Sequence, residues 1–264
     1  DSVREALAAL SAAWSKTASR TDGVVSAVKF ALEAHAGQRR LSGELYASHP
    51  LHVAAIVAHW GFDEVSVLAA CCHDVVEDCG ISIEALSSVI GPEAAKVVNG
   101  VTKVGSLHLG AEPSTESSSM TKFLAAVVDD VRTLAVKLAD RLHNLRTAQY
   151  LPPERAQRTA REALEVFAPL AHRLGLEEPR REMEDLAFSL AHPEEFSKIS
   201  KELENSAAHR HEVELIASKD VVRLLANSGL RAEIESRTKH VYSVWSKQAA
   251  TGVPVSQMHD LIGI

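Results

Sequence analysis

The sequence predicts a mainly α-helical protein with a short α+β segment near its C-terminal end. Apolar residues recur at helical spacing through almost the whole chain of 264 residues. Alanine and leucine dominate an apolar content of 46%, while aromatic residues make up only 5%, a composition that favours helix packing. Only Leu230 to Ser236 alternates apolar and polar residues with the period of two typical of a strand.

The first part of the chain predicts six helices separated by polar or glycine-containing segments. They are expected at about residues 3–19, 23–35, 49–61, 63–78, 82–90 and 91–102. Residues 37–48 are too polar for a helix interior and predict a loop. A residue before proline avoids the α region, and proline suits a first helical turn. We therefore expect His49, which precedes Pro50, at a helix start with its side chain facing a cleft.

The second part predicts a mobile loop, then longer helices. Residues 105–119, rich in Ser, Gly and Glu, are typical of a loop, either a lid or a plain linker. Helices are expected at about residues 120–130, 131–149, 152–175 (with a kink at Pro169), 180–190, 193–227 and 241–250. A domain boundary is expected near residues 191–196, which divides the chain into residues 1–192 and 193–264.

Composition excludes several classes of protein. The net charge of −7 argues against a protein that mainly binds nucleic acid. Three cysteines without a C-x-x-C pair are neither a disulfide framework nor a zinc knuckle. No signal peptide and no apolar run of membrane-spanning length is present. The start at Asp1 and the strand-like end at Asp260 to Ile264 indicate a fragment of a longer protein.

The first of two polar clusters is HDVVED, at the end of an apolar helical pattern. It places His73 four residues before Glu77, and Asp74 four residues before Asp78. Residues at that spacing share a helix face. For a lone histidine, a satisfied core side chain beside a capping aspartate would be the better interpretation.

The second cluster, in KLADRLHN, places Asp140, Asn144 and the later Thr147 on one helix face. Because two helices carry such clusters, we favour a metal site over two unrelated buried groups. With His49, two imidazoles and two carboxylates can converge on one divalent cation, through His49, His73, Asp74 and Asp140. Such a cation activates water near neutral pH. Ligand type leaves Mn²⁺, Fe²⁺ and Zn²⁺ open.

Other charged residues near these clusters are candidates for a general base and for binding the phosphates of a substrate. Either Glu77 or Asp78 could act as general base, although each alone could be a solvated helix end. Arg39 and Arg40 could hold phosphates, since guanidinium binds them bidentately. Lys137 and Arg141 flank Asp140, and a role in the site and a helix-surface position both stay open.

Six motifs between residues 24 and 190, in order and at matching spacing, closely resemble the RelA/SpoT homologue family. These bacterial and plastid enzymes make and degrade the alarmone (p)ppGpp. The motifs are GQRRLSG at 37–43, SHP at 48–50, HDVVED at 73–78, GVTK at 100–103, KLADRLHNLRT at 137–147 and APLAHRLG at 168–175. In the tail, RTKHVYSVWSK at 237–247 and HDLIGI at 259–264 resemble the start of the family's synthetase domain.

The resemblance implies an HD-domain helical bundle hydrolase in residues 1–192. Residues 193–264 would be a linker helix and the truncated start of a nucleotidyltransferase-like synthetase domain. The bundle would remove pyrophosphate from the ribose 3′ position of (p)ppGpp, with Mn²⁺ bound by His49, His73, Asp74 and Asp140. Glu77 and Asp78 would position and activate water. The nucleotide would be held by Arg40, Ser42, Asn144 and Thr147.

Asp260 matches the family's synthetase Mg²⁺ ligand, but the resemblance implies an incomplete and inactive synthetase portion. Expected partners are guanosine nucleotides (ppGpp, pppGpp, GDP and GTP), with no membrane and no direct DNA binding. Any ribosome contact would belong to domains outside this chain. The expected location is a bacterial cytoplasm, or a plastid in a plant. Two alternatives stay open: an HD-type phosphohydrolase of another nucleotide, and a degenerate hydrolase-like regulatory module.

Overall fold

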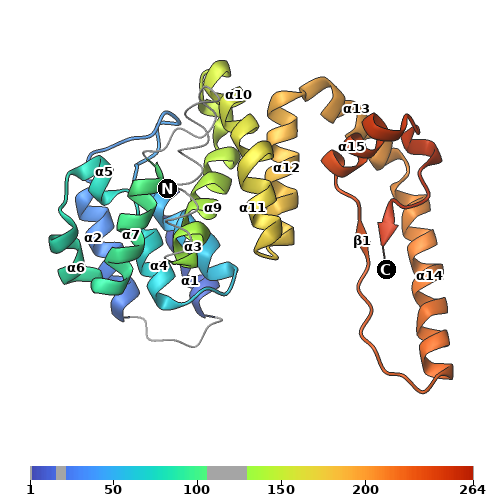
Figure 1. Cartoon of the computed structure of the whole chain (residues 1–264), viewed down its shortest axis with the longest axis horizontal. Helices are drawn as coiled ribbons and strands as arrows, with labels where there is room; N and C mark the ends of the chain where they lie inside the picture. Colours follow the sequence, from blue (N-terminus) through green and yellow to red (C-terminus); the bar gives the residue numbers. More distant parts are fainter. Residues whose placement is uncertain (1, 16–21, 106–129, 264) are drawn as a thin grey trace.

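The computed structural model describes residues 2–15, 22–105 and 130–263. Most of the predicted loop at 105–119 and the predicted helix at 120–130 lie outside the described residues. The first part of the fold is α1 (Ser2–Trp14), α2 (Asp22–Ala34), α3 (Ser48–His59), α4 (Glu64–Cys71), α5 (Val75–Cys79), α6 (Ile83–Ile90), α7 (Pro92–Gly105) and α9 (Val131–Arg146). The mainly α-helical prediction is confirmed (Figure 1).

Helices α3 and α9 lie inside the bundle and carry its buried polar residues. From Ser48 to Ala58, every residue of α3 except His52 is buried. Helix α9 buries a continuous run from Thr133 to Asp140. Helix α3 packs against α1, α4 and α9. Polar side chains on these two helices therefore lie against each other in the interior rather than on the surface.

The predicted single helix at 63–78 is wrong, because residues 72–74 interrupt it between α4 and α5. The break is stabilised locally: the Cys72 backbone N–H donates to the Ala69 carbonyl, and the His73 ring lies with Nδ1 2.9 Å from the Ala70 carbonyl oxygen. Both contacts satisfy carbonyl groups that a helix end leaves without partners. The HD pair therefore sits in a turn, not on a helix face.

Two other predicted helices are also interrupted. The helix predicted at 152–175 consists of α10 (Pro153–Glu162), a π-helical turn at Ala163–Phe167 and α11 (Ala168–Arg173). The π turn ends two residues before Pro169, which has no N–H to offer the preceding turn. The helix predicted at 193–227 is divided at Ser206, whose hydroxyl donates to the Glu202 and Leu203 carbonyls instead.

The tail follows α12 (Glu177–Ala191) and is drawn in orange and red in Figure 1. It contains α13 (Pro193–Asn205), α14 (Ala207–Asn227), β1 (Arg237–Thr238), α15 (Val241–Thr251) and β2 (Ile262–Gly263). The strand predicted at 230–236 is wrong, since that segment is extended but unpaired. The two short strands pair antiparallel instead, with Arg237 opposite Gly263 and Thr238 opposite Ile262.

Buried apolar residues form two clusters. The larger runs from Ala6 to Ala187 and joins the helices of the bundle. The smaller lies between Ile199 and Leu261. No described helix is both long and apolar enough to cross a membrane.

Candidate functional site

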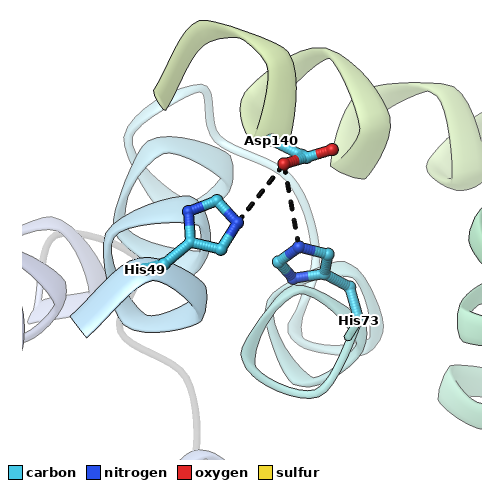
Figure 2. A group of neighbouring side chains, drawn as sticks. All are labelled: His49, His73 and Asp140. Atoms are coloured by element: carbon cyan, nitrogen blue, oxygen red, sulfur yellow. Dashed lines mark ion pairs between the residues drawn. The ribbon is translucent and has the colours of Figure 1, made fainter. Parts of the chain in front are cut away.

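Three buried side chains from three segments converge inside the bundle (Figure 2). His49 comes from the first turn of α3, His73 from the turn between α4 and α5, and Asp140 from α9. One ligand atom from each lies within 4.8 Å of the others. His49 Nε2 is 3.3 Å from Asp140 Oδ1, and His73 Nε2 is 3.9 Å from the same oxygen.

Asp74 faces this group from the turn that holds His73. Its Oδ1 lies 3.0 Å from His73 Nε2, and its Oδ2 lies 3.5 Å from His49 Nε2. The four side chains predicted as metal ligands are therefore brought together. Two imidazoles and two carboxylates are a donor set suited to a divalent transition metal.

The position of His73 directs its Nε2 atom at the carboxylates of Asp74 and Asp140. Its Nδ1 faces the Ala70 carbonyl, an acceptor, so Nδ1 carries hydrogen and Nε2 is left to face the carboxylates. Nε2 is buried and makes no hydrogen bond, even though Asp74 Oδ1 is only 3.0 Å away. Burial opposes a charge on this ring, but Asp74 and Asp140 outweigh it and raise the pKa of His73 to about 9. The two carboxylates thus favour a positive charge at Nε2.

The Asp140 carboxylate is held on both of its oxygens. Lys137 Nζ donates to Oδ2 at 2.9 Å, and Asn144 Nδ2 donates to Oδ1 at 2.6 Å. Burial alone would raise the pKa of Asp140, but Lys137 and the neighbouring imidazoles keep it well below its usual range. Lys137 is only 7% exposed, so of the two interpretations left open for it, a surface charge is excluded.

The predicted catalytic acids lie next to this cluster and line the same cavity. The Tyr46 hydroxyl lies 3.1 Å from Asp74 Oδ2 and 2.5 Å from Asp78 Oδ2. It therefore bridges Asp74, a predicted metal ligand, and Asp78, a predicted catalytic acid. Burial and both carboxylates raise the pKa of Tyr46, which keeps the hydroxyl protonated. Burial also raises the pKa of Glu77. Lys137 lowers this pKa, but the negative charges of Asp74 and Asp78 raise it further, so the net shift is upward.

The cavity that opens from the cluster has a volume of about 710 Å³. Its acidic wall is Asp74, Glu77, Asp78 and Asp140. Its basic residues are Arg39, Arg40, Lys137, Arg141, Arg155 and Arg158. A cavity of this size suits a small ligand, and the mixture of charges suits one that carries phosphates.

All four residues predicted to hold a nucleotide also line the cavity, but in this structure several are engaged elsewhere. Arg40 donates to the Asn144 side-chain oxygen at 2.8 Å. The Thr147 hydroxyl donates to carbonyls of its own helix, at His143 and Asn144. Ser42 is half-buried, and its hydroxyl contacts Glu44.

Four residues at the site were not predicted from the sequence: Tyr46, His143, Arg155 and Arg158. Tyr46 lies in an irregular loop, where no periodicity indicates which way a side chain points. His143 is 6% exposed and lies against His49, with the two Nδ1 atoms 2.8 Å apart. Its position three residues after Asp140 on a buried helix was the signal that could have found it.

The chain matches one family model and is similar over most of its length to several known proteins. A family model described as HD domain matches residues 27–177. A probable GTP pyrophosphokinase of Mycobacterium leprae is 41% identical over 241 residues, which cover 91% of this chain and 30% of that protein. The bifunctional (p)ppGpp synthase/hydrolase RelA of Mycobacterium tuberculosis is 41% identical over 238 residues, 90% of this chain and 32% of that protein.

A third similar protein is a guanosine-3′,5′-bis(diphosphate) 3′-pyrophosphohydrolase of Aquifex aeolicus. It is 36% identical over 239 residues, which cover 90% of this chain and 34% of that protein. The chain therefore spans about a third of the length of the curated relatives it matches.

Proposed function

This chain belongs to the HD domain family, and from that premise we propose that it hydrolyses (p)ppGpp, releasing pyrophosphate from the ribose 3′ position. The products are GDP from ppGpp and GTP from pppGpp. The observation that carries the proposal is the buried cluster of two histidines and two aspartates at one end of a cavity with six basic side chains. The names of the M. tuberculosis and A. aeolicus relatives support this choice of substrate.

The metal in the proposal is Mn²⁺, held by His49, His73, Asp74 and Asp140. When bound, it would lower the pKa of water and neutralise charge beside the phosphate. Lys137 and Asn144 fix the Asp140 carboxylate, and Tyr46 fixes Asp74, so the chain orients both acidic ligands before a cation arrives. Preorganised ligands of this kind are typical of catalytic metal sites.

Glu77 is the proposed general base. Its raised pKa makes the carboxylate a stronger base than an ordinary glutamate. The water oxygen forms a bond to the phosphorus on O3′ while the bond between that phosphorus and O3′ breaks. Glu77 takes a proton from water, and this proton balances the one that O3′ gains as it leaves as an alcohol. Asp78, held by Tyr46, orients the water beside Glu77.

The phosphates remote from the metal are proposed to meet Arg155 and Arg158 on α10. Lys137 is bound to Asp140 and Arg141 to Glu162, so neither charge is free. Among the described residues, Arg155 and Arg158 have no carboxylate partner, and both line the cavity. Unpaired guanidinium groups at the cavity wall suit a substrate with several phosphates.

Synthesis of the alarmone is not proposed for this chain. Both carboxylate oxygens of Asp260 lie 2.5 Å from lysine ammonium groups, those of Lys239 and Lys247. In this arrangement Asp260 is occupied by cationic side chains rather than presented to Mg²⁺.

The test is to incubate the purified chain with ppGpp, with and without Mn²⁺, and to measure GDP and pyrophosphate. Release that requires Mn²⁺ and is lost in Asp74→Ala supports the proposal. A panel of other phosphorylated nucleotides run in parallel separates it from a phosphohydrolase of different specificity. Full Mn²⁺ binding without turnover of any nucleotide would instead favour a regulatory module.

A further inference from the structure

His143 on α9 lies between a proposed metal ligand and a proposed substrate residue. Its Nδ1 is 2.8 Å from His49 Nδ1 and 3.1 Å from Arg40 Nη1. The ring is 6% exposed, and it stacks on His52 with ring centroids 5.0 Å apart. None of the roles assigned above uses this side chain.

The contact with Arg40 fixes the direction of both hydrogen bonds. A guanidinium group can only donate, so His143 Nδ1 must accept and therefore carries no hydrogen. His49 Nδ1 faces the same nitrogen, and two facing lone pairs would repel, so His49 Nδ1 carries the hydrogen and shares the lone pair of His143 with Arg40. In a neutral imidazole this leaves His49 Nε2 with its lone pair. That atom is the one directed at Asp140 and Asp74.

We propose that His143 is a positioning residue that holds His49 in the tautomer able to bind the metal through Nε2. His143 does not touch the metal or the substrate. It acts through His49, as the Ala70 carbonyl acts through His73. A metal-binding histidine generally requires such a partner on its other nitrogen.

The same contacts join Arg40 to both sides of the metal cluster. One guanidinium nitrogen donates to His143, which holds His49; the other donates to Asn144, which holds Asp140. His49 and Asp140 then meet at 3.3 Å, which closes a ring of contacts. Through this ring, the side chain predicted to bind nucleotide also supports the geometry of the ligands.

The inference rests on the metal site of the proposed function, so its test measures Mn²⁺ affinity without nucleotide. His143→Leu removes the acceptor and keeps an apolar side chain of moderate size. Its Mn²⁺ affinity should fall about 10- to 100-fold, the usual loss when such a partner is removed. His143→Asn places a carbonyl oxygen near the position of Nδ1 and should stay within about threefold of wild type, since an acceptor is restored.

His52→Leu is the matched control. It removes an imidazole that stacks on His143 but that has no hydrogen bond to a proposed ligand among the described residues. Its Mn²⁺ affinity should match wild type. Equal losses in His52→Leu and His143→Leu, or in His143→Asn and His143→Leu, would show that packing matters rather than the acceptor, and would overturn the proposal. Unchanged affinity in His143→Leu, or no Mn²⁺ binding by the wild type, would also overturn it.

A second measurement needs no variant and stands even if His143→Leu fails to fold. Nitrogen-15 NMR of the wild-type chain loaded with diamagnetic Zn²⁺ reports which ring nitrogen of His49 carries hydrogen. We expect hydrogen on Nδ1, and hydrogen on Nε2 would overturn the inference. A chain that binds Mn²⁺ as expected but leaves ppGpp intact would refute the proposed function without affecting this inference.

Discussion

At the scale of single residues, the site is organised by hydrogen bonds to the acids rather than by the acids alone. The Asp140 carboxylate accepts hydrogen bonds from Lys137 and Asn144, and the Asp74 carboxylate accepts one from Tyr46. Fixing a carboxylate in this way reduces the entropy that a metal must overcome when it binds. Residues without any contact to metal or substrate should therefore affect catalysis.

The variant Glu77→Gln distinguishes the role of general base from the role of metal ligand. The variant should keep wild-type Mn²⁺ affinity, since Glu77 is not among the proposed ligands, and lose about 10²- to 10⁴-fold in kcat, the usual contribution of a general base. Because the ionised form is the active one and its pKa is raised, wild-type kcat/KM should fall as the pH drops, starting above the usual pKa of a glutamate. Near-full activity in Glu77→Gln would contradict the assignment.

Tyr46→Phe tests the hydroxyl that joins Asp74 and Asp78. The aromatic ring stacks on His35 at 4.7 Å between centroids, and that packing survives the substitution. We expect kcat for ppGpp to fall about 10- to 100-fold while the free energy of unfolding changes little. Tyr150→Phe is the control, because Tyr150 lines the same cavity but is 53% exposed. Equal activities of the two variants would refute a role for the Tyr46 hydroxyl.

The sequence was most informative about residues with fixed spacing. Asp140 and Asn144 are four apart on one continuous helix, and the structure joins their side chains as that spacing predicts. Tyr46 and His143 act across segments 28 or more residues apart, as in the contact of Tyr46 with Asp74. No local pattern encodes such a distance, so these contacts required the folded chain.

At the scale of elements, the breaks in helices are what sequence periodicity failed to predict. The spacing of residues predicts one helix through residues 72–74, but the chain turns there, and His73 and Cys72 satisfy carbonyls of α4 at the turn. That turn directs both His73 and Asp74 towards α9. An uninterrupted helix would place these adjacent residues about 100° apart around its axis. The departure from the predicted helix is therefore part of the site.

Helix α10 presents Arg155 and Arg158, three residues apart, to the cavity. Replacing either by Gln should raise KM for ppGpp about fivefold with little change in kcat, because an exposed ion pair contributes up to about 1 kcal/mol to binding. Arg161→Gln is the control on the same helix, since Arg161 does not line the cavity. A KM that is the same in all three variants and in wild type would exclude α10 from the substrate site.

At the scale of the whole molecule, the two clusters of buried apolar residues differ in size, and one helix contacts both parts. The smaller cluster has six buried apolar residues among those described, while α14 buries none. Helix α12 joins the two parts. Phe188 packs on Trp245 with ring centroids 4.7 Å apart, and Glu184 pairs with His240 at 2.7 Å. We propose that the domain boundary expected near residues 191–196 lies just after this junction.

Because buried apolar area largely determines stability, residues 193–264 should unfold before the bundle. Tryptophan fluorescence can follow each part separately. Trp14 belongs to the larger cluster and Trp60 packs against it, while Trp245 packs against the smaller one. In urea, the variant Trp14→Phe/Trp60→Phe, which reports only on Trp245, should show a lower midpoint than Trp245→Phe, which reports on the bundle.

Each substitution changes packing in the part of the molecule that its variant does not report on, so the wild type is the control. Loss of Trp14, which is 5% exposed, weakens the bundle in the variant that reports on the tail, so the order of the two midpoints is also measured in the wild type. Circular dichroism of the wild type should show the same two steps, with the smaller loss of helix first. A single midpoint shared by all probes would mean that the junction of α12 with α15 couples the two clusters into one cooperative unit. In that case, the boundary near residues 191–196 would not separate independent domains.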